Sequence, residues 1–206
     1  MQSVLSKFKE AIDSRNRAAL TEMLPLVMEE NDIGEIFSQG VYPVLNTARE
    51  EFQNRRLGIP ELLLSLDLVS TVLKAVSKDG DIPKRNKHIV LGVIEGDTHD
   101  MGKNIIRDLY RGYGFEVTDL GKNVKVSQFV DGAVSVNADL VGISTMMSTT
   151  LDRLGEVIQL LKEKIPGVKV IVGGAFINQK IADGLKADAY AEDAATLIET
   201  TDGLLA

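Results

Sequence analysis

Short apolar runs alternate with segments of helical periodicity between residues 88 and 206, and this alternation constrains the fold more than any other feature. The runs predict strands at 89–94, 115–120, 140–144, 168–172 and 189–191, and the helical segments are 102–113, 126–136, 150–164, 179–185 and 194–205. Strands that alternate with helices of this length form a parallel sheet with right-handed crossovers. Five such units predict an α/β fold with a flavodoxin-like or Rossmann-like five-stranded parallel sheet. Its ligand crevice is expected at the carboxyl ends of the strands.

Residues 1–76 show helical periodicity and almost no strand pattern. Apolar side chains recur there at three- or four-residue spacing; they include Val4, Phe8, Ile12, Leu20, Leu24, Val27, Val41, Val44, Ala48, Val69, Val72, Leu73 and Val76. Residues 34–37 look like a short turn before a third helix, and Pro60 suits the first turn of the last helix. Helices joined by short links favour antiparallel neighbours, so we expect an N-terminal bundle of four or five helices.

The segment 77–88 is polar and charged and contains Gly80 and Pro83, which is typical of a linker. It divides the chain into a helical domain over 1–76 and an α/β domain over 89–206. His88 opens the first strand, and we expect it to be structural.

Composition excludes several classes of function. The net charge of −7 argues against nucleic-acid binding, which needs a basic surface. The absence of cysteine excludes disulfides and thiolate metal sites and fits a reducing compartment. Residues 1–10 lack the apolar core of a signal peptide, and no apolar run approaches the roughly 20 residues that span a bilayer. We therefore expect a cytoplasmic protein that binds neither nucleic acid nor membranes.

A polar loop is predicted at 95–104, after the first strand, and it carries one of only two histidines in the chain, His99. Five residues separate Gly96 from Gly102, where a phosphate-binding P-loop has four, and Asn104 replaces its hydroxyl residue. A zinc site usually needs three or four ligands. With no cysteine, and with the other histidine beyond the strand, a zinc cage built by the protein is not expected.

A metal held in a macrocycle changes this requirement, because the ring supplies the equatorial nitrogens and the protein need supply only one axial ligand. His99 can be that ligand. Asp97 can accept a hydrogen bond from its other ring nitrogen and so fix the tautomer. The plainer interpretation of the same loop is a β–α turn with an N-capping aspartate and a solvent-facing histidine.

The pattern Asp97-x-His99-x-x-Gly102 resembles the Asp-x-His-x-x-Gly signature of cobalamin-binding domains. In that family the histidine displaces the cofactor's own base and ligates cobalt from below. The resemblance implies that His99 is the axial cobalt ligand and that Asp97 hydrogen-bonds it and couples ligation to proton uptake.

Three other strand ends add candidate residues. The third strand leads into the hydroxyl-rich segment 144–149, the fourth into Gly173-Gly174, and the fifth ends at Ala191. The hydroxyls can bind a buried polar ligand, although we also expect Ser148 or Thr149 to cap the next helix. The paired glycines let a bulky group approach the backbone or make a tight turn.

These positions also match the cobalamin-binding pattern. Ser144 matches the serine of a Ser-x-Leu motif, with Met146 in place of leucine, and is expected to extend the Asp97 relay or hold the nucleotide tail. Gly173-Gly174 matches the motif beside which that tail threads. The resemblance implies catalytic roles for His99, Asp97 and Ser144. The cofactor-binding residues that it implies are Asp97, Thr98, His99, Asp100, Met101, Gly102, Ser144, Met146, Ser148, Gly173, Gly174 and Ala191.

The resemblance covers the whole chain, because the helical bundle is similar to the cap that covers the corrin in methyl-carrying proteins such as methionine synthase. It implies a corrinoid protein of a multi-component methyltransferase system that serves methylamine, methanol, betaine or methoxyaromatic substrates. Such a protein is not catalytic alone. Its cobalamin alternates between cob(I)alamin and methylcobalamin. The implied partners are a substrate methyltransferase, an acceptor methyltransferase and a reductive activating protein. The methyl acceptor is tetrahydrofolate or a thiol cofactor.

Three other functions each lack a required element in this sequence. A phosphoacceptor receiver domain needs an aspartate after the third strand and a lysine after the fifth, where this chain has Ser144 and Glu192. A cobalamin-dependent sensor needs an output element such as a basic DNA-reading helix, and the acidic bundle offers none. A mutase cobalamin subunit needs a substrate-holding barrel, which would have to be a separate chain.

Overall fold

The computed structural model describes residues 4–79, 84–191 and 194–206. It divides into two compact units, Met1–Ile82 and Pro83–Ala206. Among the described residues, no helix combines the length and the apolar character needed to cross a membrane. The linker predicted over 77–88 is only partly described: α5 continues to Asp79, 80–83 lie outside the described residues, and His88 begins β1.

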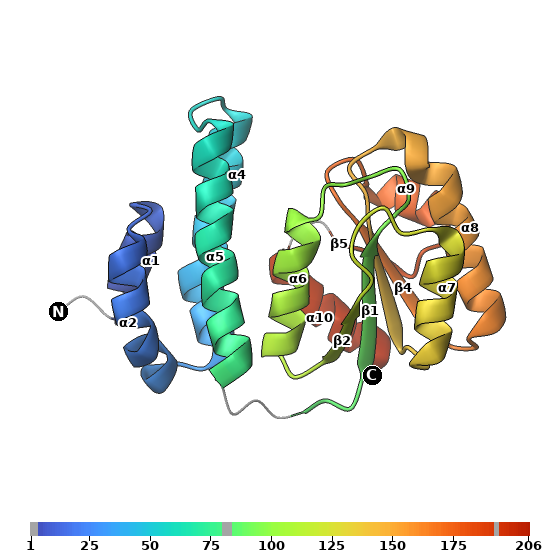
Figure 1. Cartoon of the computed structure of the whole chain (residues 1–206), viewed down its shortest axis with the longest axis horizontal. Helices are drawn as coiled ribbons and strands as arrows, with labels where there is room; N and C mark the ends of the chain where they lie inside the picture. The colour runs from blue at the N-terminus through green and yellow to red at the C-terminus, as the bar shows by residue number, and fades with distance from the viewer. Residues whose placement is uncertain (1–3, 80–83, 192–193) are drawn as a thin grey trace. The chain divides into compact units, whose positions relative to one another are not determined.

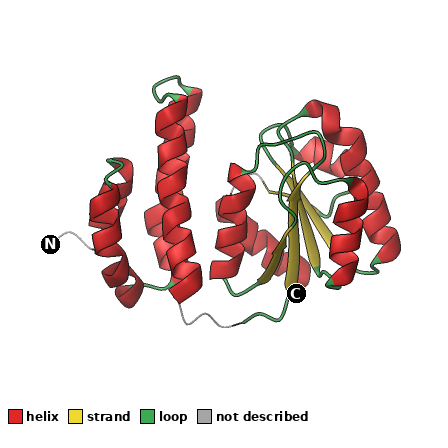
Figure 2. Ribbon diagram, viewed as in Figure 1, coloured by secondary structure: helices red, strands yellow, loops and turns green. Residues whose placement is uncertain are grey.

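The first unit is helical, as predicted (Figure 1 and Figure 2). Its elements are α1 (Val4–Asp13), α2 (Arg17–Glu30), α3 (Ile33–Glu35), the π-helical η1 (Ile36–Val41), α4 (Tyr42–Gln53) and α5 (Ile59–Asp79). Asn16 caps α2 by accepting a hydrogen bond from the backbone N–H of Ala19 at 3.1 Å. The apolar faces of these helices meet in a core that includes Phe8, Ile12, Val69 and Leu73.

The turn predicted at residues 34–37 is wrong, because the chain is helical from Ile33 through α4. Asp32 and Glu35 form a capping box that starts the helix just before this segment. Gly40 lies against Phe8, and a Cβ on Gly40 would come within 3.1 Å of the Phe8 ring. Gly40, in η1, therefore serves close packing against α1.

The second unit contains the predicted five-stranded sheet, with all strands parallel. The strands are β1 (His88–Val93), β2 (Glu116–Asp119), β3 (Leu140–Ser144), β4 (Lys169–Gly173) and β5 (Ala189–Ala191), in the spatial order β2-β1-β3-β4-β5. This order confirms the flavodoxin-like topology. It also places the carboxyl ends of all strands at one edge, where ligands bind in such sheets.

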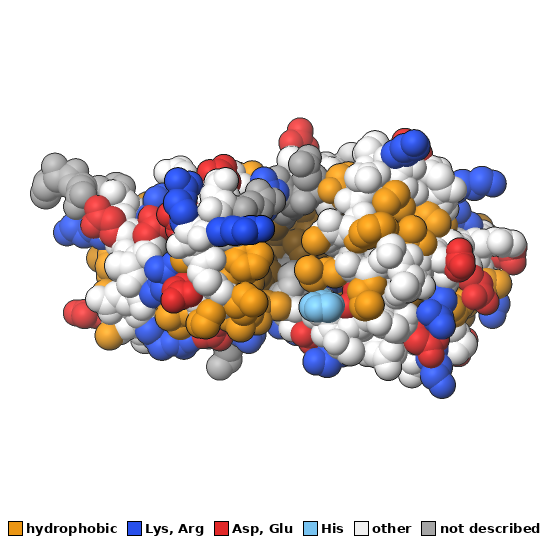
Figure 3. Space-filling model, turned by 90° about the horizontal axis from the view of Figure 1, so that it is seen from above, with side chains coloured by type: hydrophobic (Ala, Val, Ile, Leu, Met, Phe, Trp, Pro, Cys, Tyr) orange, Lys and Arg blue, Asp and Glu red, His pale blue; other side chains and the backbone are white. Residues whose placement is uncertain are grey.

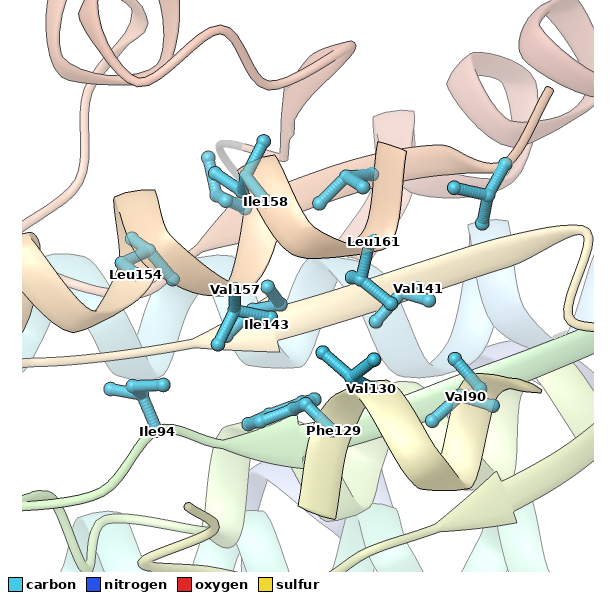
Figure 4. Close-up of a cluster of buried hydrophobic side chains, with 14 of the residues drawn as sticks. Val90, Ile94, Phe129, Val130, Val141, Ile143, Leu154, Val157, Ile158 and Leu161 are labelled. Carbon is cyan, nitrogen blue, oxygen red and sulfur yellow. The ribbon is translucent and has the colours of Figure 1, made fainter. Parts of the chain in front are cut away.

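Helices cover both faces of the sheet (Figure 1). They are α6 (Met101–Gly112), α7 (Val126–Ser135), the 3₁₀ turn η2 (Ser148–Thr150), α8 (Leu151–Lys164), α9 (Gln179–Gly184) and α10 (Ala194–Leu205). On one face, side chains of α7 and α8 form a buried cluster with the central strands; Figure 4 shows Phe129 and Val130 of α7 and Leu154 and Val157 of α8 among its members. On the other face α6 and α10 are joined by a hydrogen bond between the Tyr110 and Thr201 hydroxyls at 2.7 Å.

A buried ion pair fastens α6 to the end of β2. The Lys103 side chain, only 2% exposed, places its ammonium 2.6 Å from both carboxylate oxygens of Asp119. Arg107 adds a second cation at 3.1 Å, and the backbone N–H of Gly121 donates to Asp119 at 2.9 Å. Burial alone raises the pKa of Asp119, but Lys103, Gly121 and Arg107 outweigh it and hold the pKa below its usual value.

We expect Asp119→Asn to destabilise the protein by about 3 kcal/mol at pH 7, because it leaves the Lys103 charge buried without its partner. A carboxyl group whose pKa is lowered by folding stabilises the protein above its unfolded pKa and loses that effect in acid. The difference in unfolding free energy between wild type and variant should therefore shrink below about pH 4, as measured by urea denaturation.

The exposed pair Lys9–Asp13 provides the control. Asp13→Asn should change the unfolding free energy by less than about 1 kcal/mol at every pH. Two results would contradict a stabilising role for the buried pair. One is a change in unfolding free energy for Asp119→Asn as small as that for Asp13→Asn. The other is a change that is the same at pH 7 and pH 3.

Candidate functional site

One row of residues crosses the sheet at its carboxyl edge. Val93 of β1 pairs with Ser144 of β3, Ser144 pairs with Gly173 of β4, and Gly173 pairs with Ala191 of β5. The sheet therefore brings together the segments that follow four strands, including the predicted residues of the first, third and fourth loops. Glu192, which follows β5, lies outside the described residues.

The loop after β1 holds a histidine–carboxylate pair. Nδ1 of His99 lies 2.6 Å from Oδ1 of Asp97, and the backbone N–H of His99 donates to the same oxygen at 2.9 Å. The predicted hydrogen bond between these side chains is thus confirmed. Because Nδ1 carries the proton toward a carboxylate, the Nε2 lone pair remains free. The His99 side chain is 58% exposed, whereas Asp97 is completely buried.

The second oxygen of Asp97 is held by the loop after β3. The backbone N–H of Met146 donates to Oδ2 at 2.5 Å, and the Thr145 hydroxyl donates to it at 3.1 Å. Burial raises the pKa of Asp97, but the hydrogen bonds from Met146, His99 and Thr145 together lower the pKa to about 2. Asp97 is therefore a charged acceptor at neutral pH, and it keeps the proton on Nδ1 of His99.

The plainer interpretation of this loop fits the structure in part: the loop is a β–α turn and the His99 side chain is exposed, but the expected capping by an aspartate side chain is wrong. Asp100 occupies the N-cap position of α6 but makes no side-chain capping hydrogen bond, and Asp97 binds the β3 loop instead. The predicted capping by Ser148 or Thr149 is also wrong. The N-cap positions of η2 and α8 are Met147 and Thr150, and neither side chain caps its helix.

Thr145, not Ser144, reaches Asp97, which corrects the relay expected for Ser144. Successive side chains of an extended segment point to opposite sides, so only one of these two neighbours can face the carboxylate. The Thr145 hydroxyl also lies 2.8 Å from the Thr150 hydroxyl. In the sequence, Thr145 stands out only as one of several hydroxyl residues in the segment 144–149. The sequence does not indicate which of these hydroxyls contacts Asp97.

The paired glycines make room for neighbouring backbone. A Cβ on Gly174, where φ is +119°, would lie 1.9 Å from the carbonyl oxygen of Thr145. A Cβ on Gly173 would lie 3.2 Å from the carbonyl oxygen of Ala191. Neighbouring backbone therefore explains why both positions are glycine. The close approach of a ligand, which the motif predicts, would be a second reason.

Exposed hydrophobic side chains surround the histidine loop. Met101 follows it, Met146 and Met147 belong to the β3 loop, and Phe176 belongs to the β4 loop. Figure 3 looks down on this edge and shows hydrophobic side chains gathered beside a histidine on the sheet unit. Met147 and Phe176 were not among the predicted residues, although Phe176 lies only two positions after Gly174.

Comparison with known proteins decides the family. Residues 87–204 match the model of the B12 binding domain. The chain belongs to the B12-binding domain family. This match covers the described sheet unit except residues 84–86 and 205–206, and it includes the histidine loop.

Relatives extend over the helical unit as well. The chain is 35% identical over 209 residues to dimethylamine corrinoid protein 1 of Methanosarcina mazei, which covers 99% of this chain and 97% of the relative. It is 28% identical, with a TM-score of 0.65, to a cobalamin-binding protein of Desulfitobacterium hafniense, over 98% of both chains. A chain of the methanol:cobalamin methyltransferase complex of Methanosarcina barkeri shares the fold, with a TM-score of 0.60 and 23% identity, over 98% of this chain and 79% of that one.

The site of this B12-binding domain fits its cofactor, a corrinoid. No group of three or more metal-ligating side chains occurs among the described residues. One exposed histidine with a free Nε2 matches the single axial position that a macrocycle leaves to the protein. The methionines and the phenylalanine nearby suit the apolar surface of a flat ring.

We expect Gly174→Ala to lower the unfolding free energy of the B12-binding domain by about 2–5 kcal/mol, because the new Cβ clashes with Thr145 and strains a positive φ. The measurement is urea denaturation of the apoprotein. Gly203→Ala, in α10, is the matched control because no atom lies within 4 Å of its Cβ position. It should raise stability by up to about 1 kcal/mol. Equal stability of the two variants would contradict the close approach at Gly174.

Proposed function

We propose that this chain is the methyl-carrying corrinoid protein of a multi-component methyltransferase system. It binds cobalamin with the cofactor's own base displaced and His99 in its place. A substrate-specific methyltransferase loads the methyl group, and a second methyltransferase passes it to tetrahydrofolate or a thiol cofactor. The observation that carries this proposal is the exposed His99, held by a buried Asp97, at the ligand edge of a B12-binding domain.

The bound cobalt supplies the chemistry by accepting the methyl group from one partner and giving it to the other. The chain supplies the ligand and its control. Nε2 of His99 would ligate the cobalt, while Asp97 holds Nδ1–H and would increase the basicity of the ring. Ser144 and the Gly173-Gly174 corner, which share one row of the sheet, are proposed to hold the nucleotide tail.

The relatives support a carrier that works with separate enzymes. A dimethylamine corrinoid protein of nearly the same length aligns with this chain over both units. The fold also occurs in a methanol:cobalamin methyltransferase complex. We therefore propose the two methyltransferases and a reductive activating protein as partners, in the cytoplasm, and we assign no catalytic activity to the isolated chain.

The helical unit is proposed to act as the cap over the corrinoid. Hydrophobic side chains are exposed where α4 ends and α5 begins: Phe52, Ile59, Leu63 and Leu64. Exposed apolar patches of this kind mark surfaces that bind a partner or ligand. We propose that this patch covers the apolar upper face of the cofactor between encounters with the partner enzymes.

Cofactor retention tests the site directly. Purified protein mixed with hydroxocobalamin and desalted should keep the corrinoid, with an absorption spectrum that changes in His99→Ala because the axial ligand is lost. Leu63→Glu should retain less corrinoid because it places a charge in the hydrophobic patch. Leu26→Glu is the matched control, since Leu26 in α2 is 46% exposed and Leu63 is 45% exposed. A wild-type protein that emerges without corrinoid would refute the proposal.

Methyl transfer tests the carrier role. Reduced holoprotein, mixed with a methyltransferase from the same organism and a substrate labelled in its methyl group, should acquire the label in proportion to its corrinoid content. The acceptor methyltransferase should then remove it. Dimethylamine, methanol, betaine and methoxyaromatic substrates form the panel. Bound corrinoid that takes no label from any of them would favour a sensor or a mutase subunit instead.

A further inference from the structure

We propose that the three methionines at the carboxyl edge of the sheet, Met101, Met146 and Met147, are a site of oxidation by peroxides, and that their conversion to methionine sulfoxide weakens corrinoid binding. The second half of this inference rests on the proposed function, which places the corrinoid at this edge. The reacting atoms are the thioether sulfurs, and a hydroperoxide is the oxygen donor.

Exposed methionines gather at this one edge in the part of the chain that the structure describes. Met101, Met146 and Met147 are 37%, 47% and 38% exposed. The other two described methionines, Met23 and Met28 of α2, are only partly exposed. The chain has no cysteine, so methionine is its only sulfur-containing residue. Because a peroxide must reach the sulfur in order to oxidise it, the methionines of the ligand edge should react first.

The two methionines of the β3 loop are held in place by their backbone. The N–H of Met146 donates to Oδ2 of Asp97 at 2.5 Å, and the N–H of Met147 donates to Oγ1 of Thr145 at 3.1 Å. The carbonyl of Met147 also accepts a hydrogen bond from the Thr150 hydroxyl at 2.8 Å. The exposure of both side chains therefore follows from the folded conformation of the loop.

The three methionines lie close to the candidate axial ligand. Met101 follows His99 by two positions and begins α6. The backbone N–H of Met146 and Nδ1 of His99 bind the two oxygens of the same Asp97 carboxylate. Figure 3 shows hydrophobic side chains gathered beside the histidine. A flat ring whose metal is bound by His99 would therefore extend over these side chains.

The oxidation transfers one oxygen atom. A lone pair of the thioether sulfur attacks one oxygen of the hydroperoxide, so that an S–O bond forms and the O–O bond breaks. The proton of the transferred OH group passes to the leaving oxygen, which departs as water when the oxidant is hydrogen peroxide. Sulfur loses two electrons and the peroxide gains them. Methionine sulfoxide reductases reverse the change.

A sulfoxide changes what the edge can bind. The thioether is apolar and polarisable, whereas the sulfoxide is polar. Covering its oxygen with an apolar ring surface, without a hydrogen-bond donor, is unfavourable. Loss of the apolar contact of one methionine is expected to weaken corrinoid affinity about tenfold. Oxidation of all three should weaken it further.

The first measurement locates the oxidation in the apoprotein. The protein is treated with hydrogen peroxide for increasing times, the reaction is stopped with catalase, and each methionine is quantified by peptide mass spectrometry. Met101, Met146 and Met147 should reach half conversion several-fold earlier than Met23 and Met28. Equal rates at all of these positions, or faster oxidation in α2, would refute a selective site at the ligand edge.

The second measurement titrates hydroxocobalamin into treated and untreated apoprotein. The readout for each protein is the ratio of its dissociation constants after and before treatment, so that the basal affinity of a variant does not matter. The ratio should rise at least about tenfold in wild type and in the control Met23→Leu/Met28→Leu. Treatment should leave the affinity of Met101→Leu/Met146→Leu/Met147→Leu unchanged, because leucine keeps a similar volume and has no sulfur.

Two further experiments keep the test decisive. If the triple variant does not fold, Met101→Leu and Met146→Leu/Met147→Leu are tested separately, and each should lose part of the sensitivity to peroxide. Treatment of the oxidised wild type with methionine sulfoxide reductases A and B should restore its affinity. Affinity that stays low after the sulfoxides at the edge have been reduced would refute the coupling.

The outcomes separate this inference from the proposed function. If wild type binds corrinoid equally well with and without sulfoxides at the edge, the coupling is refuted while the carrier function stands. The same holds if peroxide weakens the triple variant as much as wild type. If untreated wild type binds no corrinoid, the proposed function and the coupling both fail, and the peptide map still decides whether the edge is a selective oxidation site.

Discussion

The structure of the ligand edge depends on one buried charge, the carboxylate of Asp97. A carboxylate removed from water is costly unless its lone pairs are satisfied, and here four donors from two loops satisfy them. The charge therefore requires both loops to be in place at once. The same hydrogen bonds hold the two loops together and give the exposed histidine a defined tautomer.

The sheet makes this arrangement possible because β1 and β3 are neighbours, although α6, β2 and α7 separate them along the chain. The strand order reverses between β1 and β3, and at such a point consecutive connections diverge to opposite faces and leave a crevice. Asp97 follows one of these strands and its donors Thr145 and Met146 follow the other. These hydrogen bonds thus hold the loops after β1 and β3 together at the carboxyl edge of the sheet.

The loop after β2 stiffens the histidine loop from the other side. Asn123 accepts a hydrogen bond from the backbone N–H of Gly96 at 2.8 Å, and its own N–H donates to the carbonyl of Asp97 at 3.1 Å. The buried pair of Lys103 and Asp119 fastens the start of α6 nearby. A metal ligand on a loop can be accurately placed only when that loop is tied to rigid elements in this way. The exposed His99 is consequently carried by a loop whose backbone is held on both sides.

The sequence by itself determined the order of strands and helices, the edge of the sheet at which the candidate residues gather, and the pairing of His99 with Asp97. These features depend on local periodicity and on residues two positions apart, which a single chain displays directly. Only the tertiary structure decided that Thr145 rather than Ser144 reaches Asp97, that Gly174 is required by the Thr145 carbonyl, and that residues 34–37 are helical. Each of these features depends on which group of a distant segment packs against the residue in question. Spacing along the sequence does not contain that information.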